Sequence, residues 1–350
     1  MTMSPLELLP IPLLEWFGEH ARVLPWRSDP TPYHVWVSEI MLQQTRVTAV
    51  LGYYERFMTA VPTVADLARL PEEQLMKLWQ GLGYYNRARN LQKAARQIMD
   101  NFGGIFPDNY EDIRSLAGVG DYTAGAIASI AFGIPVPAVD GNVLRVVSRI
   151  NGDDSDIALT TTKERVRREL AQIIPVGQAS WFNQAMMELG ATVCLPNGAP
   201  QCDRCPARDF CRAQLEDRTS ALPVKAPKKA RRVEDRVVFL IFHEGQVALR
   251  QRAKQGLLAG LWEFPNESAP AADALSQWNI QVRDMQLAGT GRHIFTHIEW
   301  HMTAYTVLSE NDALPEGWVW SDRNELERQY AVPNAFRAFE PVVKKMLGYF

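Results

Sequence analysis

The sequence lacks any long apolar run, and this absence argues against a membrane-spanning helix. No stretch approaches the roughly 20 consecutive apolar residues that such a helix needs. The opening segment, MTMSPLELLPIPLLEWFGEH, carries Glu7, Glu15 and Glu19, and it has neither a basic region nor a small-residue cleavage site. We therefore expect no export signal and a cytoplasmic protein of bacterial type, in a compartment where disulfides are rare.

Excess positive charge is also missing. The 350 residues hold 37 Lys and Arg against 40 Asp and Glu, a net charge of −3. Residues 1–224 alone hold 21 basic and 25 acidic residues, a net charge of −4. Domains that bind nucleic acid are more often basic, so any such contact would depend on local patches and backbone amides.

The length and the texture of the chain predict two domains. From about residue 6 to residue 213, apolar residues recur at spacings of three and four between short Pro/Gly breaks, which is typical of helices. Beyond residue 234 the short runs VVFLIF, QVALRQR and EWHMTAYTVL predict strands, and residues 271–278 and 335–348 have helical patterns. We predict a mainly α domain over residues 1–217 and an α+β domain over residues 235–350.

Residues 218–234 between these domains are poor in apolar side chains. Five positive charges lie between Lys225 and Arg232. An exposed basic linker is the favoured interpretation, and a phosphate-contacting segment is the alternative.

Cysteine is scarce and its placement is informative. All four cysteines fall within 18 residues, in the pattern C-x7-C-x2-C-x5-C, at Cys194, Cys202, Cys205 and Cys211. In a reducing compartment this clustering predicts a metal site rather than disulfides, and the spacing accepts either zinc or an iron–sulfur cluster. Three interleaved arginines form a possible phosphate-binding patch: Arg204, Arg208 and Arg212.

Two features of the helical region are typical of DNA repair chemistry when they occur together. Gly118, Val119 and Gly120 stand directly before an amphipathic helix, so a helix-hairpin-helix could hold a phosphate on its backbone amides, although an ordinary turn is the alternative. Glu39 lies in the apolar run WVSEIMLQQT and Asp140 precedes a helix in VDGNVLRVVSRI. The alternatives are a solvent-facing Glu39 and an Asp140 that only caps its helix.

The order of these motifs resembles the helix-hairpin-helix glycosylase superfamily that includes endonuclease III, and within it the MutY-type adenine DNA glycosylases. The resemblance runs almost end to end and is carried by LPWR (24–27), SEIMLQQT (38–45), GLGYYNRARNL (81–91), GVGDYTAGAIAS (118–129), VDGNV (139–143), FNQAMMELGATVC (182–194) and the cysteines. It implies a [4Fe-4S] cluster on the four cysteines. The first cysteine spacer has seven residues where the family pattern has six, and we expect the loop to absorb the extra residue.

The resemblance also implies the catalytic residues. Glu39 would be the general acid that protonates adenine, which requires burial to raise its pKa well above about 4.3. Asp140 would remain ionised and stabilise the sugar cation, while Asn142 and Tyr122 orient the reacting groups. Endonuclease III-type lyases have a lysine where this chain has Tyr122, so we predict a monofunctional glycosylase with at most weak strand cleavage.

Further residues are implied around a base flipped out of the duplex. The adenine pocket would consist of Arg22, Leu24, Trp26, Arg27, Leu42 and Gln184, with core packing as the alternative for the three apolar members. The predicted DNA contacts are Gln44 and Tyr84, as wedges in the duplex, together with Thr45, Arg87, Gly118, Val119 and Gly120.

The second domain opens with a segment that resembles a Nudix-type fold, DRVVFLIFHEGQVALRQRAKQGLLAGLWEFPNE. The Glu-rich helix that binds Mg²⁺ in Nudix hydrolases is replaced by SAPAADALSQWNI, which favours a recognition module. Phe295, Thr296 and His297 match the loop that reads 8-oxoguanine in MutY-type enzymes. The four-residue spacing of His293, His297 and His301 would suit a metal face on a helix, but the flanking residues favour strand or loop.

The substrate implied is double-stranded DNA with an adenine:8-oxoguanine mispair, bound by a monomer, and no membrane partner is expected. Three alternatives are disfavoured. Tyr122 and the additional C-terminal domain argue against an endonuclease III-like lyase for oxidised pyrimidines. The joint presence of Glu39 and Asp140 argues against a catalytically silent DNA-binding protein, and the missing Glu-rich helix against a nucleotide-pyrophosphate hydrolase.

Overall fold

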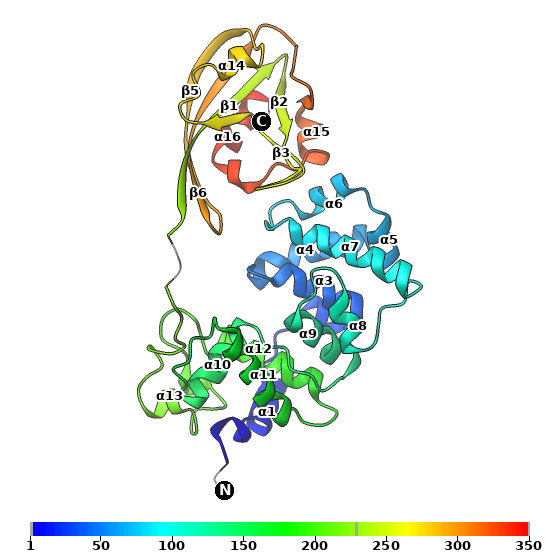
Figure 1. Ribbon diagram of the computed structural model, residues 1–350, viewed down its shortest axis with the longest axis vertical. Coiled ribbons are helices and arrows are strands. Elements are labelled where there is room, and N and C mark those ends of the chain that lie inside the picture. Colours follow the sequence, from blue (N-terminus) through cyan, green and yellow to red (C-terminus); the bar gives the residue numbers. More distant parts are fainter. Residues whose placement is uncertain (1–2, 228–229, 349–350) are drawn as a thin grey trace. The chain divides into compact units, whose positions relative to one another are not determined.

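A computed structural model describes residues 3–227 and 230–348. The chain forms two compact units, one comprising Met1–Arg69 with Asn90–Pro227 and the other Leu70–Arg89 with Lys228–Phe350 (Figure 1). Within the described ranges, no helix combines the length and the apolarity that crossing a bilayer would require. The basic residues Lys228 and Lys229 of the predicted linker lie outside the described residues.

The first unit is helical, as the spacing of apolar residues predicts. Its elements are η1 (Pro5–Leu8), α1 (Pro10–His20), α2 (Pro25–Ser28), α3 (Pro32–Leu42), α4 (Val47–Ala60), α5 (Val64–Arg69), most of α7 (Asn86–Asn101), α8 (Tyr110–Ser115), α9 (Asp121–Phe132), α10 (Gly141–Asn151), α11 (Thr160–Ile173), α12 (Ala179–Thr192), η2 (Cys202–Arg204) and α13 (Arg212–Leu215).

Local sequence signals set the ends of these helices. Thr31 and Asn109 cap α3 and α8 with their side-chain oxygens. Gly133 and Gly152 end α9 and α10 in the left-handed conformation, at φ 69° and 64°. Helix α9 also contains Gly125, where a Cβ atom would lie 2.5 Å from the carbonyl oxygen of Pro137, so only glycine allows the loop before α10 to approach.

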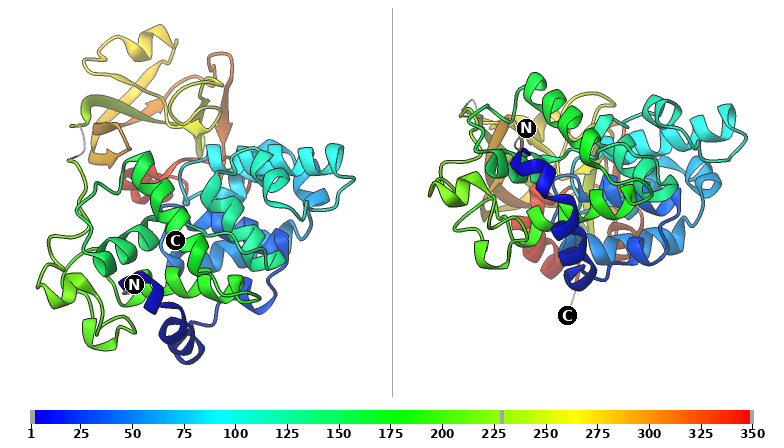
Figure 2. Two further views of the ribbon diagram at one scale, coloured as in Figure 1. Left: turned by 60° about the horizontal axis from the view of Figure 1, so that its bottom comes forward. Right: turned by 90° about the horizontal axis from the view of Figure 1, so that it is seen from below.

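One apolar core joins α1, α10 and α12. Leu13 and Phe17 of α1, Val143 and Val147 of α10, and Phe182 of α12 belong to the same buried cluster. Helix α1 packs against α12 in this core (Figure 2). Helix α12, which leads to the first cysteine, is therefore held rigidly by this core.

The second unit contains a seven-stranded sheet. Its strands are β1 (Arg232–His243), β2 (Gln246–Gln251), β3 (Trp262–Glu263), β4 (Asn266–Ser268), β5 (Val282–Ile294), β6 (Ile298–Ser309) and β7 (Trp318–Ser321). The main strand order is β3-β2-β1-β6-β5, with β4 paired to β1 and β7 to β2. Strands β1 and β6 run parallel and the other pairs run antiparallel.

Alternation along β1 creates a core on each face of this sheet. Val238 and Leu240 point into one apolar cluster, whereas Phe239 and Ile241 point into the other. The first cluster is covered by residues from η3 (Asn334–Phe339) and α16 (Glu340–Met346), and the second by α14 (Ala274–Gln277). The short helix α15 (Arg323–Arg328) precedes η3. The predicted α+β character of this region is confirmed.

The second unit also includes Leu70–Arg89, which the sequence-based boundary at residue 217 places in the helical domain. This segment contains α6 (Glu72–Trp79). Lys77 Nζ donates to the carbonyl oxygens of Leu326 at 2.8 Å and Tyr330 at 3.0 Å. Lys77 thereby satisfies carbonyls at the end of α15, and burial lowers the pKa of its ammonium to about 8.

Candidate active site and cysteine loop

Glu39 lies on α3 and is buried, with 5% of its surface exposed, so the solvent-facing alternative is wrong. The hydroxyl of Tyr122, from the first turn of α9, donates a short hydrogen bond to Glu39 Oε2. The same hydroxyl lies 3.4 Å from the sulfur of Met187 on α12. Three helices therefore meet around one carboxyl group.

Burial raises the pKa of Glu39 to about 7 because the charged form loses its hydration. The hydrogen bond from Tyr122 opposes this rise, the negative charge of Asp140 adds to it, and the positive charge of Arg27 opposes it. A carboxyl group with this pKa can hold a proton near neutral pH, as a general acid must.

Asp140 caps α10, as the sequence predicts, and its negative charge also acts on Glu39. Its Oδ1 accepts from the backbone amide of Val143 at 2.8 Å and its Oδ2 from Asn142 Nδ2 at 2.7 Å. Burial raises the pKa of Asp140, while the donors on Val143 and Asn142 and the charge of Arg145 oppose the rise. The cap and a catalytic role are therefore compatible in one side chain.

Asn142 is itself held from two sides. Arg145 Nη2 donates to Asn142 Oδ1 at 2.8 Å, and the same guanidinium donates to the carbonyl oxygens of Gly190 and Cys194 at 2.7 Å each. A Cβ atom on Gly190 would lie 2.6 Å from the Cβ of Asn142, so glycine allows α12 to approach α10 here. This contact fixes the side chain that orients Asp140.

The loop before Asp140 is anchored to α12 by Asn183. Its Oδ1 accepts from the amide of Ala138 at 2.8 Å and its Nδ2 donates to the carbonyl oxygen of Val136 at 2.9 Å. Asn183 is 2% exposed, so these bonds satisfy a buried amide.

Tyr122 stays a neutral phenol in this site. Burial and the charges of Glu39 and Asp140 raise its pKa well above the usual value. A phenol donates a hydrogen bond but has no amine for a Schiff base.

A single cavity of about 1010 Å³ joins the catalytic and the predicted pocket residues. The predicted residues that line it are Glu39, Tyr122, Asp140, Asn142, Arg22, Leu24, Trp26, Arg27, Leu42, Gln184, Gln44 and Thr45. Leu24 and Trp26 are buried as well as facing the cavity, so packing and pocket lining coincide for them.

Several lining residues are absent from the sequence-based prediction, among them Met187 and Glu188. Glu188 is four positions after Gln184 on α12, and residues at this spacing share a helix face. The four-residue spacing from Gln184 was the sequence signal that could have placed Glu188 at the cavity. Glu188 forms ion pairs with Arg22 Nε at 2.5 Å and with Arg27 Nη2 at 2.8 Å.

The predicted hairpin lies between α8 and α9. Gly118 has φ 75°, and a Cβ atom there would lie 2.6 Å from the Cβ of Asn90. Gly120 is the N-cap of α9 and provides no side-chain cap, so the helix N-terminus presents its backbone toward any anion. Asp121, the first residue of α9, pairs with Arg114.

The two predicted wedge residues share an unusual backbone conformation. Gln44 has φ 58° and Tyr84 has φ 47°, values that non-glycine residues rarely adopt and that often mark functional positions. Tyr84 is 48% exposed. Arg87 donates to the carbonyl oxygens of Leu82 at 3.1 Å and Gly83 at 3.2 Å, so it supports the loop that presents Tyr84.

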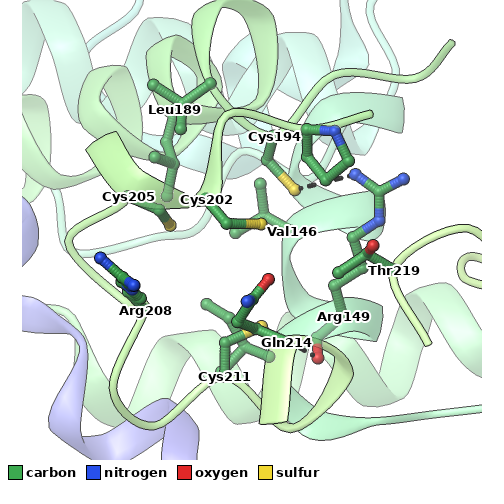
Figure 3. Close-up of a pocket in the computed structure, with 13 residues that line it drawn as sticks. Val146, Arg149, Leu189, Cys194, Cys202, Cys205, Arg208, Cys211, Gln214 and Thr219 are labelled. Carbon is green, nitrogen blue, oxygen red and sulfur yellow. Dashed lines mark hydrogen bonds between the residues drawn. The ribbon is translucent and has the colours of Figure 1, made fainter. Parts of the chain in front are cut away.

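Cys194, Cys202, Cys205 and Cys211 line one further cavity (Figure 3). Arg149 Nη1 donates to Cys194 Sγ at 3.3 Å, and Cys211 Sγ lies 3.4 Å from the carbonyl oxygen of Arg149. The amide of Gln201 donates to the carbonyl oxygen of Val193 at 2.9 Å and closes the seven-residue spacer. The extra residue is thus absorbed while the four thiols stay together.

Among the described residues, no three His, Cys, Asp or Glu side chains are arranged to hold a single metal ion. An all-thiolate set of four cysteines is a donor set that either zinc or an iron–sulfur cluster accepts. Burial raises the pKa of the Cys205 thiol to about 12.

The predicted recognition residues form the turn between β5 and β6. The amide of Phe295 donates to the carbonyl oxygen of Ile298 at 2.8 Å, and its ring packs 5.0 Å from the ring of Trp300. Thr296 and His297 are exposed at the tip. His293 lies on β5 and His301 on β6, so the helical metal face is absent, as the flanking residues predict.

Comparison with protein families matches both units. Residues 37–176 match the model of the HhH-GPD superfamily of base excision DNA repair proteins. Residues 237–339 match the NUDIX domain. The helical domain with its hairpin and the Nudix-like second domain are thereby confirmed.

Curated relatives match over most of the chain. The adenine DNA glycosylase of Rattus norvegicus is 34% identical over 94% of this chain and 77% of its own length. The adenine DNA glycosylase of Buchnera aphidicola subsp. Acyrthosiphon pisum is 33% identical over 83% of each chain.

Solved structures match the helical part. A thermostable thymine-DNA glycosylase has a TM-score of 0.56 at 28% identity and covers 61% of this chain and 97% of its own. Endonuclease III in a non-covalent complex with DNA has a TM-score of 0.52 at 27% identity, covering 62% of this chain and 99% of its own.

Proposed function

Since this chain belongs to the adenine DNA glycosylase family, we propose that it removes adenine mispaired with 8-oxoguanine or guanine in double-stranded DNA. The observation that carries the proposal is the pair of buried carboxyl groups, Glu39 and Asp140, on the wall of one cavity. Hydrolysis of an N-glycosidic bond needs a protonated leaving group and a stabilised sugar cation, and two carboxyl groups in different environments supply both.

In this reaction Glu39 gives its proton to N7 of adenine. Burial keeps a proton on Glu39 near neutral pH, and Tyr122 fixes the carboxyl through its hydrogen bond to Oε2. After transfer, Tyr122 continues to donate to the new carboxylate and stabilises it.

Asp140 acts on the sugar. Its carboxylate is oriented by the amide of Val143 and the side chain of Asn142, so it presents a fixed negative charge to the oxocarbenium-like centre. The same position allows a transient covalent bond to the anomeric carbon, which water then hydrolyses.

The volume of the cavity suits an extruded nucleotide. Its volume of about 1010 Å³ is at the upper end of ordinary ligand pockets. A base flipped into it would lie among the aromatic and apolar side chains of Leu24, Trp26 and Leu42 and the polar group of Gln184. Gln44 and Tyr84 are each proposed to insert into the duplex as wedges, and Thr45, Arg87 and the hairpin 118–120 are each proposed to contact DNA.

The absence of an amine on Tyr122 supports a monofunctional reaction. The product would be an abasic site in an intact strand, because strand cleavage by β-elimination begins with a Schiff base on a lysine.

The turn of Phe295, Thr296 and His297 is proposed to recognise 8-oxoguanine. The Thr296 hydroxyl is exposed at the tip and can donate to an acceptor on the oxidised base or accept from a donor there. Phe295 anchors the turn through its contact with Trp300.

The four cysteines are proposed to hold a [4Fe-4S] cluster. Their all-thiolate donor set and their common cavity fit this group. When bound, the cluster supplies a folding cross-link for the loop 194–211, which carries Arg204, Arg208 and Arg212 toward phosphate.

A single-turnover assay tests the proposal on three duplexes that differ at one pair. We expect adenine release opposite 8-oxoguanine, none opposite thymine, and strand breaks chiefly after alkali. Release of thymine glycol paired with adenine, with direct nicking, would assign the chain to the lyase branch. No release from any duplex would support the silent DNA-binding alternative.

A further inference from the structure

Glu188 on α12 is a buried carboxylate that the proposed reaction does not use. Its side chain is fully buried. Oε1 accepts from Arg22 Nε at 2.5 Å, and Oε2 accepts from Arg22 Nη2 at 2.9 Å and from Arg27 Nη2 at 2.8 Å. One carboxylate therefore binds two guanidinium groups on the wall of the cavity that contains Glu39.

The geometry of this cluster is fixed by further contacts. Arg27 Nη1 donates to the carbonyl oxygen of Arg22 at 3.1 Å, and the Arg27 guanidinium lies 5.4 Å from the ring centre of Phe17. Arg22 also donates its backbone amide to Glu188 Oε1 at 3.3 Å. Neither guanidinium can turn away without breaking several of these contacts.

We propose that Glu188 is a positioning residue for base removal, which holds Arg22 and Arg27 at the cavity wall and cancels part of their charge beside Glu39. This inference rests on the proposed function of the same cavity, and it assigns a role to a residue that the sequence analysis left without one.

The charge balance around Glu39 explains why such a residue is needed. Tyr122 from α9, Asp140 at the start of α10 and Arg27 from α2 act on Glu39, and Arg27 favours the ionised form. A general acid must keep its proton until the base is bound. By pairing with both arginines, Glu188 offsets the charge of Arg27 that favours ionised Glu39, while both arginines remain on the cavity wall.

Glu188 is suited to this task because it remains charged. Burial raises the pKa of Glu188, but the hydrogen bonds of Arg22 and the charge of Arg27 outweigh burial and hold the pKa below its usual value. Its own charge is therefore constant over the pH range in which Glu39 titrates.

The test combines two readouts on the full-length protein. The first is the ¹³C NMR titration of the Glu39 carboxyl group, assigned by its loss in Glu39→Gln. The second is the single-turnover rate of adenine release against pH. The variants are Glu188→Gln, Arg22→Gln and, as a matched carboxyl-to-amide control, Glu169→Gln, whose carboxylate pairs with Arg165 outside the cavity at 2.9 Å.

We expect opposite shifts from the two cluster variants. Glu188→Gln leaves the charge of Arg27 beside Glu39 without its carboxylate partner, so the Glu39 pKa and the alkaline limb of the rate profile move down by about one unit. The rate at about pH 8 then falls by about tenfold. Arg22→Gln removes one positive charge and moves the same limb to higher pH, and Glu169→Gln leaves it in place.

A Glu39 titration that is unchanged in folded Glu188→Gln would overturn the inference, as would shifts of the same sign in both cluster variants. If Glu188→Gln does not fold, the direction of the shift in Arg22→Gln decides alone. The NMR titration needs no substrate, so it tests this inference independently of the proposed function. Failure of the proposed function would show instead as no adenine release by the wild type.

Discussion

Replacing Glu39 by glutamine should stop adenine release and at the same time stabilise the protein at alkaline pH. Glutamine is isosteric with the protonated carboxyl group and can accept the same hydrogen bond from Tyr122. It cannot donate an acidic proton to the base, so we expect the single-turnover rate to fall by at least about a hundredfold.

The stability change follows from the raised pKa of Glu39. The folded value is about 7 and the ordinary value is 4.5. The folded state therefore binds more protons than the unfolded state between these two pH values, and the free energy of unfolding falls as the pH rises through them. A shift of about 2.5 units corresponds to about 3 kcal/mol, and this cost is complete above about pH 8. The Glu39→Gln variant does not lose this stability, because glutamine does not ionise.

The assay is pulse proteolysis in urea from about pH 5 to pH 8.5, with the wild type and the variant side by side so that other titrating groups cancel. We expect the difference in stability to grow by about 3 kcal/mol across this range. In Tyr122→Phe, which removes a bond that lowers the Glu39 pKa, the loss of stability should be larger and should extend to higher pH. A difference between Glu39→Gln and wild type that does not change with pH would refute the reasoning.

Three further changes test other parts of the site. Gly190→Ala places a Cβ atom 2.6 Å from the Cβ of Asn142, so thermal unfolding should show that the free energy of unfolding falls by about 1–3 kcal/mol. Single-turnover kinetics should show slower adenine release, because Asp140 loses its orienting partner Asn142. Thr296→Ala should reduce the preference for adenine opposite 8-oxoguanine over adenine opposite guanine by about tenfold, measured by competition, with little effect on the guanine mispair. Tyr122→Lys should introduce strand cleavage and a borohydride-trapped complex with DNA, and their absence would contradict the role given to position 122.

The helices of the first unit could be predicted because each buries one face or all of its surface. Helix α3 is buried from Tyr33 through Met41 with few interruptions, and a helix that is apolar all round belongs in a core. The same apolar pattern does not indicate the environment of Glu39. Periodicity cannot say which polar residue in such a helix faces a cavity, and only the resemblance to a family identified Glu39 as functional.

Other features of the fold and the site have no signal in the local sequence. Strand β5 is largely exposed, so no alternation marks it, and it exists because its backbone pairs with β6. The grouping of Leu70–Arg89 with the second unit depends on contacts such as Lys77 with the carbonyl groups of Leu326 and Tyr330, which are some 250 residues away in sequence. The pairing of Glu188 with Arg22 spans 166 positions along the chain.

Helix α12 combines functions that other proteins distribute over several segments. Asn183 anchors the loop before Asp140, Glu188 binds two arginines, Gly190 admits Asn142, and the chain leaves the helix toward Cys194. Ala185, Met186 and Leu189 fill the core between these positions. Such a helix has little mutational tolerance, because almost every substitution disturbs a partner on another element. Changes within α12 should therefore occur together with changes in the residues they contact.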